Sequence, residues 1–155
     1  LPAQVDLLTG RAVFTHAYAV IPKGVMRDIV TSCLPFWDGT REKKVVIQYC
    51  RKAKKFQHFP RPTSIFTGRR GDIEWREISG KGEIFSYTVT YRGTDKFRAV
   101  EPYAVACVTF EGAGVNHIAN MVNCKEEDLK VGMKVKPYWM PLEDGTNLLM
   151  FQPDK

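Results

Sequence analysis

The chain from Ile73 onward carries closely spaced β-strand signals, and this pattern restricts the fold more than any other feature. The run "GEIFSYTVTY" is aromatic and β-branched, with Phe85, Tyr87, Val89 and Tyr91 predicted on one face. The segment "IEWREIS" alternates in the same way. Four more strands are expected at "YAVACVTF", "VNHIANMV", "KVKPYWM" and "TNLLMFQ".

The connections between these runs indicate how the strands are joined. "EGAG" and Asp144-Gly145 favour hairpin turns. "CKEEDLKVGM" predicts a short helix or turn, with acids placed at its positive N-terminal end. Three strands, a short helical connection and two strands fit a five-stranded Greek-key barrel of the OB type. The sequence therefore predicts a mainly β protein with an OB-fold domain over residues 73–155.

Residues 42–72 have the outline of a small zinc ribbon with most of its ligands missing. In "CRKAKKFQHFPRPTSIFTG" only Cys50 is a thiol, because the other knuckle positions hold Ala53, Ser64 and Thr67. A structural zinc site needs four ligands, so we expect a degenerate ribbon without metal. Its fold is then expected to depend on apolar packing, by the side chains of Phe56, Phe59, Ile65 and Phe66.

Residues 1–41 give weaker signals and are predicted to be a helical or irregular segment. A short helix fits "VMRDIVTSCL", and Pro35 is expected to end it. The following "PFWDGTREKK" is predicted to form a short amphipathic turn or helix. There Phe36 and Trp37 would be exposed aromatic residues and would form a contact surface.

Positive charge gathers in the ribbon. Ten Lys and Arg residues but one acid, Glu42, lie between Arg41 and Arg70, whereas the chain after Asp72 is slightly acidic. Such a patch attracts polyanions, so nucleic acid, a phosphorylated cofactor or an acidic partner surface are candidates. A solvated basic face would have the same composition.

Several classes of protein find no support in the sequence. It contains no Gly-x-Ser-x-Gly elbow, and Cys107, Cys124 and His117 lack the setting of catalytic groups, so no catalytic residue is predicted. "GKG" at residues 80–82 predicts a strand-opening turn. Four cysteines make no disulfide framework, and no apolar run is long enough to span a membrane. We therefore expect a cytoplasmic protein with reduced thiols.

Several motifs, in order, resemble those of a known family. They are "PFWDG", "YCRKAKKFQHFPRP", "IEWREISGKGEIFSYTVTYR", "EPYAVACVTFEGAGVNHIANMVNCKEEDLKVGMKVKPYW" and "DGTNLLMFQPDK". Over residues 35–153 the chain resembles thiolase-associated proteins that join an N-terminal helix, a rubredoxin-like zinc ribbon and a C-terminal OB fold. Family members commonly have cysteine at all four knuckle positions, and here only Cys50 remains.

The resemblance implies an accessory subunit that has no catalytic residues of its own. It would bind acyl-CoA, with no covalently bound cofactor, and would dock a thiolase-like or acyl-CoA hydratase-like subunit. Basic candidates for the coenzyme A phosphates, or for a partner, are Arg51, Lys52, Lys54, Lys55, Arg61, Arg69 and Arg70. Candidates for contact with a partner or the acyl group are Phe36, Trp37, Phe59, Pro60, Tyr87 and Tyr103.

Two alternatives remain open at this level. An OB-fold binder of single-stranded nucleic acid would use Tyr87, Tyr91, Arg92 and Phe97 as a platform, although the basic charge lies upstream of the barrel. The chain could also be an enzyme in its own right. Separately, residues 1–34 weakly resemble the N-terminal edge of ureidoglycine aminohydrolase-like cupins, without the His-x-His core that their metal chemistry needs.

Overall fold

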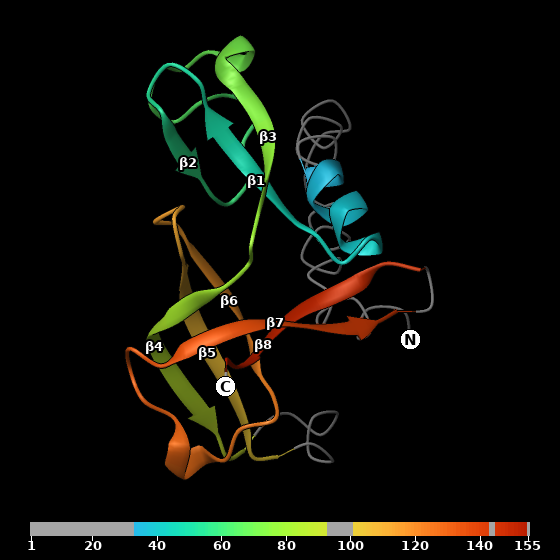
Figure 1. The fold of residues 1–155 in the computed structure, drawn as a ribbon, viewed down its shortest axis with the longest axis vertical. Coiled ribbons are helices and arrows are strands. Elements are labelled where there is room, and N and C mark those ends of the chain that lie inside the picture. The colour runs from blue at the N-terminus through green and yellow to red at the C-terminus, as the bar shows by residue number, and fades with distance from the viewer. Residues whose placement is uncertain (1–32, 93–100, 143–144, 155) are drawn as a thin grey trace.

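The structure is a computed structural model that describes residues 33–92, 101–142 and 145–154. These residues form a helix over 33–41, a three-stranded sheet and a closed five-stranded barrel. Figure 1 shows the sheet above the barrel, with the helix beside the sheet and next to the far ends of β7 and β8. The mainly β fold predicted from the sequence is confirmed. The weak cupin resemblance falls almost wholly outside the described residues.

The three-stranded sheet is the ribbon, and its strand order is β2-β1-β3. It consists of β1 (Val45–Cys50), β2 (Lys55–Gln57) and β3 (Ile73–Ile78), all antiparallel. β3 is the segment "IEWREI", which pairs along its whole length with β1. The change from ribbon to barrel therefore falls after β3, whereas the sequence suggested a boundary at residue 73.

The barrel has the order β4-β5-β6-β8-β7 and closes between β7 and β4. Its strands are β4 (Gly82–Thr90), β5 (Tyr103–Phe110), β6 (Asn116–Met121), β7 (Lys134–Pro141) and β8 (Asn147–Pro153). A 3-10 turn, η3 (Glu126–Asp128), joins the first three strands to the last two. This is the predicted OB arrangement, with the connection in the predicted place. A second 3-10 turn, η1 (Arg70–Asp72), precedes β3.

A β-bulge changes which side chains of β4 share a face. The register shifts between Ile84 and Ser86, after which Tyr87 pairs with Ala106 on the core side of β5. Phe85, at the bulge, is 62% exposed. The prediction that Phe85 and Tyr87 share a face is therefore wrong, because the extra residue inverts the alternation.

The helix continues past Pro35 and ends by residue 41, so the prediction that Pro35 ends it is wrong. A proline lacks the N–H that would bond toward the preceding turn, but it does not prevent the helix from continuing after it. The helix ends where Lys43 adopts a left-handed φ of 56° and the Lys44 N–H donates to the Gly39 carbonyl.

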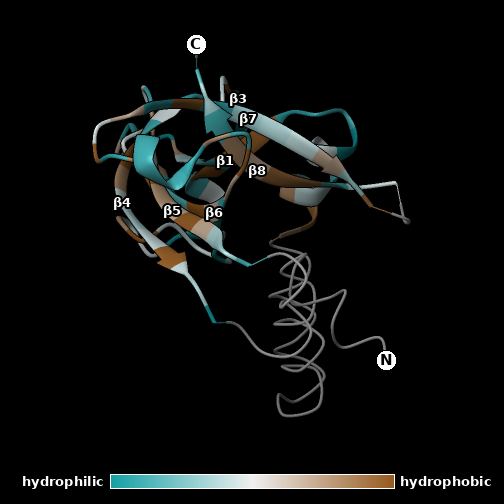
Figure 2. Cartoon of the chain, turned by 90° about the horizontal axis from the view of Figure 1, so that it is seen from below, coloured by the Kyte–Doolittle hydropathy of each residue, from teal (hydrophilic) through white to brown (hydrophobic). Residues whose placement is uncertain are grey.

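One hydrophobic core joins the helix, the ribbon and the barrel. Phe36 from the helix and Val45 and Ile47 from β1 belong to the same buried cluster as the barrel residues Phe110 and Phe151. Figure 2 shows the hydrophobic character of β8, which supplies the last of these residues. At the other end of the helix, buried Asn147 donates its side-chain N–H to the carbonyl of buried Thr40, at 2.7 Å. The three parts therefore depend on one another for burial.

Gly80 is the tightest point of the junction between ribbon and barrel. A Cβ at this position would lie 2.6 Å from Pro137 Cγ of β7 and 2.7 Å from Val45 Cγ2 of β1. Its φ is +70°, a conformation that favours glycine. β4 begins at the last glycine of "GKG", as predicted for a strand-opening segment, and the first glycine lets the sheet and the barrel approach.

Replacing Gly80 with alanine tests this junction, with Gly112→Ala as the matched control. Gly112 has φ +74° but no atom within 4 Å of the place that a methyl group would take, so its variant measures the backbone strain alone. We expect Gly80→Ala to lose about 1–3 kcal/mol more unfolding free energy than Gly112→Ala, because the methyl group overpacks a stiff contact. Urea denaturation measures both, and equal losses would contradict the account.

Candidate functional site

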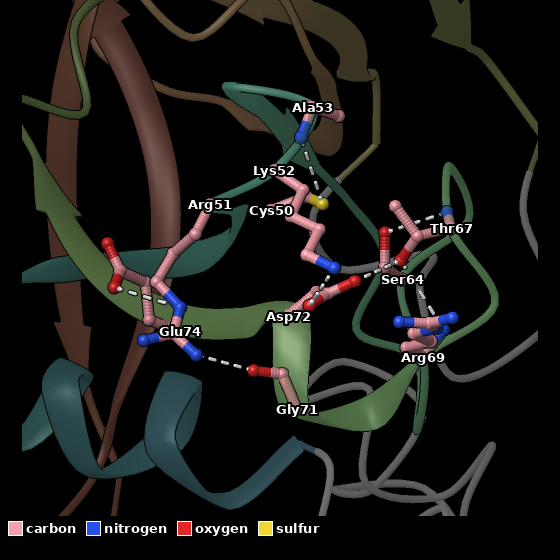
Figure 3. A network of polar contacts seen from close by, with 10 residues as sticks. All are labelled: Cys50, Arg51, Lys52, Ala53, Ser64, Thr67, Arg69, Gly71, Asp72 and Glu74. Atoms are coloured by element: carbon pink, nitrogen blue, oxygen red, sulfur yellow. Dashed lines mark hydrogen bonds and ion pairs between the residues drawn. The ribbon is translucent and has the colours of Figure 1, made fainter.

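The former knuckle positions are held together by hydrogen bonds (Figure 3). The Cys50 Sγ accepts the Ala53 N–H at 3.4 Å. The Ser64 Oγ accepts the N–H groups of Phe66 and Thr67, at 3.2 and 3.3 Å. Both Cys50 and Ser64 are fully buried, and a hydrogen bond from Ser64 lowers the pKa of the Cys50 thiol. Two knuckle-like turns therefore persist around one sulfur and one hydroxyl.

Asp72 is the acceptor for one of the other two positions, Thr67. The Thr67 hydroxyl donates to Asp72 Oδ2 at 2.8 Å, and the Lys52 Nζ lies 3.9 Å from Asp72 Oδ1. Figure 3 shows these groups converging between the turns. No group of three His, Cys, Asp or Glu side chains able to hold a metal gathers anywhere in the described ranges. The expectation of a zinc-free ribbon remains a prediction.

Two buried glutamines hold the loop between β2 and β3. Gln57 donates to Gln48 Oε1 at 2.7 Å and accepts the Ile65 N–H at 2.9 Å. Gln48 in turn bonds both backbone groups of Arg61, each at 2.9 Å. Because buried amides are costly when unpaired, this pairing fixes the path of the loop.

The apolar packing expected to hold the ribbon is found only in part. Phe56 is partly buried, but Phe59, Ile65 and Phe66 are 55%, 63% and 41% exposed. The glutamine bonds turn the loop so that these three side chains face outward. The apolar side chains that the ribbon buries are instead those of Val45 and Ile47 on β1. The expectation for Phe59, Ile65 and Phe66 is therefore wrong, and all three are exposed apolar side chains of this loop.

A pair of histidines joins the ribbon to the barrel. His58 Nε2, in the loop, lies 2.9 Å from His117 Nδ1, on β6. The rings of Phe36, Phe110 and Phe151 lie within about 6 Å of His117 centre to centre. Burial lowers the pKa of His58 to about 4, and burial together with the charge of His58 lowers that of His117 to about 3. Both rings are therefore neutral near pH 7.

A groove of about 730 Å³ lies next to this pair, between the ribbon and the β5–β6 hairpin. The ribbon wall carries Lys54, Lys55 and Arg76 together with Tyr49, Phe56 and Phe66, and the barrel wall is residues 112–115. Arg76 lies over the Tyr49 ring at 3.5 Å, and Lys55 lies 5.9 Å from the centre of the Phe66 ring. Figure 1 shows this hairpin rising from β5 and β6 toward the ribbon. We call it the ribbon–barrel groove.

The structure divides the seven predicted basic residues into three groups. Lys54 and Lys55 line the ribbon–barrel groove. Arg51 and Lys52 lie beside the hydrogen-bonded residues Cys50, Ala53, Ser64, Thr67 and Asp72, which we call the knuckle network. Arg51 contacts Glu74 at 3.8 Å, and Lys52 contacts Asp72. Arg61, Arg69 and Arg70 are exposed and do not line the groove.

The predicted contact residues are likewise separated. Phe36 is 8% exposed and part of the core, so its expected exposure is wrong, and Trp37 packs edge-on against it. Phe59 is exposed in the loop and Pro60 is partly buried. Tyr87 donates to the Leu129 carbonyl at 3.0 Å, and Tyr103 is partly buried at the start of β5.

The nucleic-acid platform finds little electrostatic support in the described part. The Tyr91 hydroxyl donates to Glu126, and η3 carries three consecutive acids that would repel phosphates. Phe97, the fourth proposed member, lies outside the described residues.

Sequence reasoning missed Arg76 and the meeting of the two histidines. Arg76 lies on "IEWREI", which the sequence placed in the OB-fold domain, so its position beside Tyr49 was not visible. His58 and His117 are 59 positions apart, and no local pattern marks such a pair.

A small antiparallel ribbon packed on a closed OB barrel defines the class of protein, and comparison with known proteins agrees. A family model described as the ChsH2 C-terminal OB-fold domain matches residues 75–140. A DUF35 domain-containing scaffold protein of Pyrococcus furiosus is 30% identical over 103 residues, which cover 65% of this chain and 73% of that protein. The chain belongs to the family of DUF35 domain-containing scaffold proteins with a C-terminal OB fold, which confirms the resemblance.

Two further matches are to proteins whose descriptions name an enzyme. A probable enoyl-CoA hydratase alpha subunit of Thermomonospora curvata is 27% identical over 121 residues, covering 76% of this chain but 36% of that protein. The chain thus spans about a third of that relative. The solved structure of the Ltp2-ChsH2(DUF35) aldolase has a TM-score of 0.70 and 26% identity, covering 80% of this chain and 95% of that chain.

The knuckle network should make ribbon stability depend on Ser64 and not on metal. Ser64→Ala removes the acceptor of two backbone N–H groups and one of the hydrogen bonds to the Cys50 sulfur, so we expect a loss of about 1–3 kcal/mol. Ser79→Ala removes a similar bond, to the Lys81 N–H, at an exposed position and should cost less. A chelator should leave the melting temperature unchanged, and metal analysis should find no zinc. One zinc per chain would refute the account.

The histidine pair should make stability fall on mild acidification. Unfolded histidine binds a proton near pH 6.5, whereas the folded pair resists it down to about 4 and about 3. Stability is therefore fully present above pH 6.5 and is lost as pH falls, by about 1.4 kcal/mol per pH unit for each histidine.

Urea denaturation at pH 7.5, 6.5 and 5.5 measures this slope before most carboxylates titrate. His117→Phe should retain about half of it, because His58 remains buried among aromatic rings. A slope identical to that of the unmodified chain would show that the pair is not its source.

Proposed function

We propose that the chain is an accessory subunit without catalytic residues of its own, which docks a thiolase-like or acyl-CoA hydratase-like subunit and helps to bind acyl-CoA. The observation that carries this proposal is the exposure of three apolar side chains of one loop, of which Ile65 and Phe66 line the basic groove and Phe59 lies outside its lining. Exposed apolar groups gathered in this way are typical of protein contact sites.

The relatives support this class of function. DUF35 relatives are described as scaffold proteins, and the similar solved structure is a complex of Ltp2 with a DUF35 protein. The hydratase relative is described as the alpha subunit of an enoyl-CoA enzyme. The thiolase-like partner comes from the sequence resemblance alone.

The buried chemistry also fits a non-catalytic subunit. The two histidines that meet in the described part are bonded to each other under aromatic rings. A general base must reach the proton that it abstracts, and burial here lowers the pKa of both rings well below neutrality. His117 does not line the ribbon–barrel groove, and His58, which does, has its Nε2 bonded to His117.

Reconstitution tests the proposal. The purified chain is mixed with thiolase-like and acyl-CoA hydratase-like proteins of the same organism, and complexes are sought by size-exclusion chromatography with light scattering. We expect one of them to form a stable complex and to gain activity in it. Phe59→Ser, at the exposed apolar residue that does not line the groove, should weaken that complex about tenfold, because it removes apolar contact area. Phe85→Ser, at an exposed aromatic residue on the barrel, is the matched control.

Two outcomes would contradict this function. The first is the absence of a complex with any such protein. The second is turnover of acyl-CoA by the chain alone, which would make it an enzyme in its own right.

A further inference from the structure

The ribbon–barrel groove is positively charged and has no acid in its lining. Its ionisable cationic residues are Lys54, Lys55 and Arg76. Arg76 uses its Nε to contact Glu74, outside the lining, and its guanidinium also stacks on Tyr49. A guanidinium has five N–H donors, so one contact leaves most of them for another acceptor.

Aromatic rings contact two of these cations, and one of the two, Arg76, is also paired with Glu74. Lys55 lies near the Phe66 ring, and Arg76 lies over Tyr49, which itself packs against Phe56 at 4.9 Å. A cation–π contact orients a cation without cancelling its charge. The groove therefore presents oriented positive charge beside flat aromatic surface.

The opposite wall is low and open. It is the β5–β6 hairpin, where Gly112 and Gly114 both have positive φ and no atom within 4 Å of a Cβ position. The volume of about 730 Å³ is within the range of small-molecule sites. A groove with one cationic aromatic wall and one small-residue wall suits a flat, multiply anionic molecule.

We propose that the ribbon–barrel groove binds the 3′-phosphorylated ADP end of acyl-CoA, with its phosphates at Lys54, Lys55 and Arg76. Its adenine lies against the aromatic wall near Phe66. This inference rests on the proposed function, because acyl-CoA is the ligand proposed there. It assigns binding to Lys54 and Lys55 among the seven basic candidates, adds Arg76, and places the other five outside the site.

Charge-matched double variants test the location. Isothermal titration with coenzyme A is performed on the unmodified chain, on Lys54→Gln/Lys55→Gln and on Arg69→Gln/Arg70→Gln. Each double variant removes two charges from the exposed surface of the ribbon, and only the first removes them from the groove. We expect the groove variant to bind about tenfold or more weakly, as loss of charged hydrogen bonds to phosphate implies. The control should change about twofold or less.

Ligand fragments test the orientation. 3′,5′-ADP should compete with coenzyme A, and pantetheine should not. Competition by pantetheine alone, or equal weakening in both double variants, would overturn the assignment to this groove. Tighter binding of a single-stranded oligonucleotide that also requires Lys54 and Lys55 would overturn the ligand class.

The design separates this inference from the proposed function. If the unmodified chain binds coenzyme A but the groove variant binds it equally well, the groove assignment fails and the accessory function remains. If the chain forms its complex with a catalytic subunit but binds no coenzyme A at saturating concentration, in the complex or alone, the groove assignment fails with the ligand part of the proposal. If it forms no complex, the docking proposal fails, whatever the titration shows.

Discussion

The path of the loop between β2 and β3 depends on two buried glutamine side chains. Gln48 and Gln57 satisfy backbone groups of Arg61, Thr63 and Ile65 through five hydrogen bonds that include their own pairing. In a low-dielectric interior such bonds are strong, and leaving any of them unmade is costly. A small ribbon usually needs a metal or another cross-link. Here the side-chain amides of the two glutamines fix the path of the loop. Hydrogen bonds of Ser64, Thr67 and Asp72 hold the turn within it.

The fixed loop determines what the ribbon presents to the barrel and to its surroundings. It directs His58 inward to His117 and turns Phe59, Ile65 and Phe66 outward. Because Phe36 and Val45 bury themselves in the same cluster as Phe110, the ribbon cannot move independently without exposing apolar surface. The groove between ribbon and barrel is thus formed by two walls held at a fixed separation.

Local patterns predicted the barrel well, because each strand and turn depends on neighbouring residues. Alternation located β5 to β8, and the glycines of "EGAG" marked the hairpin that forms one groove wall. Pairings between segments that are distant in the sequence could not be predicted from local patterns. The segment of β3 alternates equally well for either sheet, and only its pairing with β1 decides the matter. The bulge in β4 and the burial of Gln57 follow from tertiary contacts that no single-sequence period records.

The lost zinc ligands have an electrostatic consequence for the ribbon surface. Four thiolates around one divalent zinc carry a net negative charge, and hydroxyl groups at the same positions carry none. In this chain the acid within the knuckles, Asp72, is offset by Lys52. Lys54, whose φ is 52°, and Lys55 line the groove, and no acid is part of that lining. Because three of the four positions in this chain hold no thiol, the positive charge of Lys54 and Lys55 is less compensated than in a four-cysteine ribbon, and an anionic ligand beside the barrel hairpin would be attracted by it.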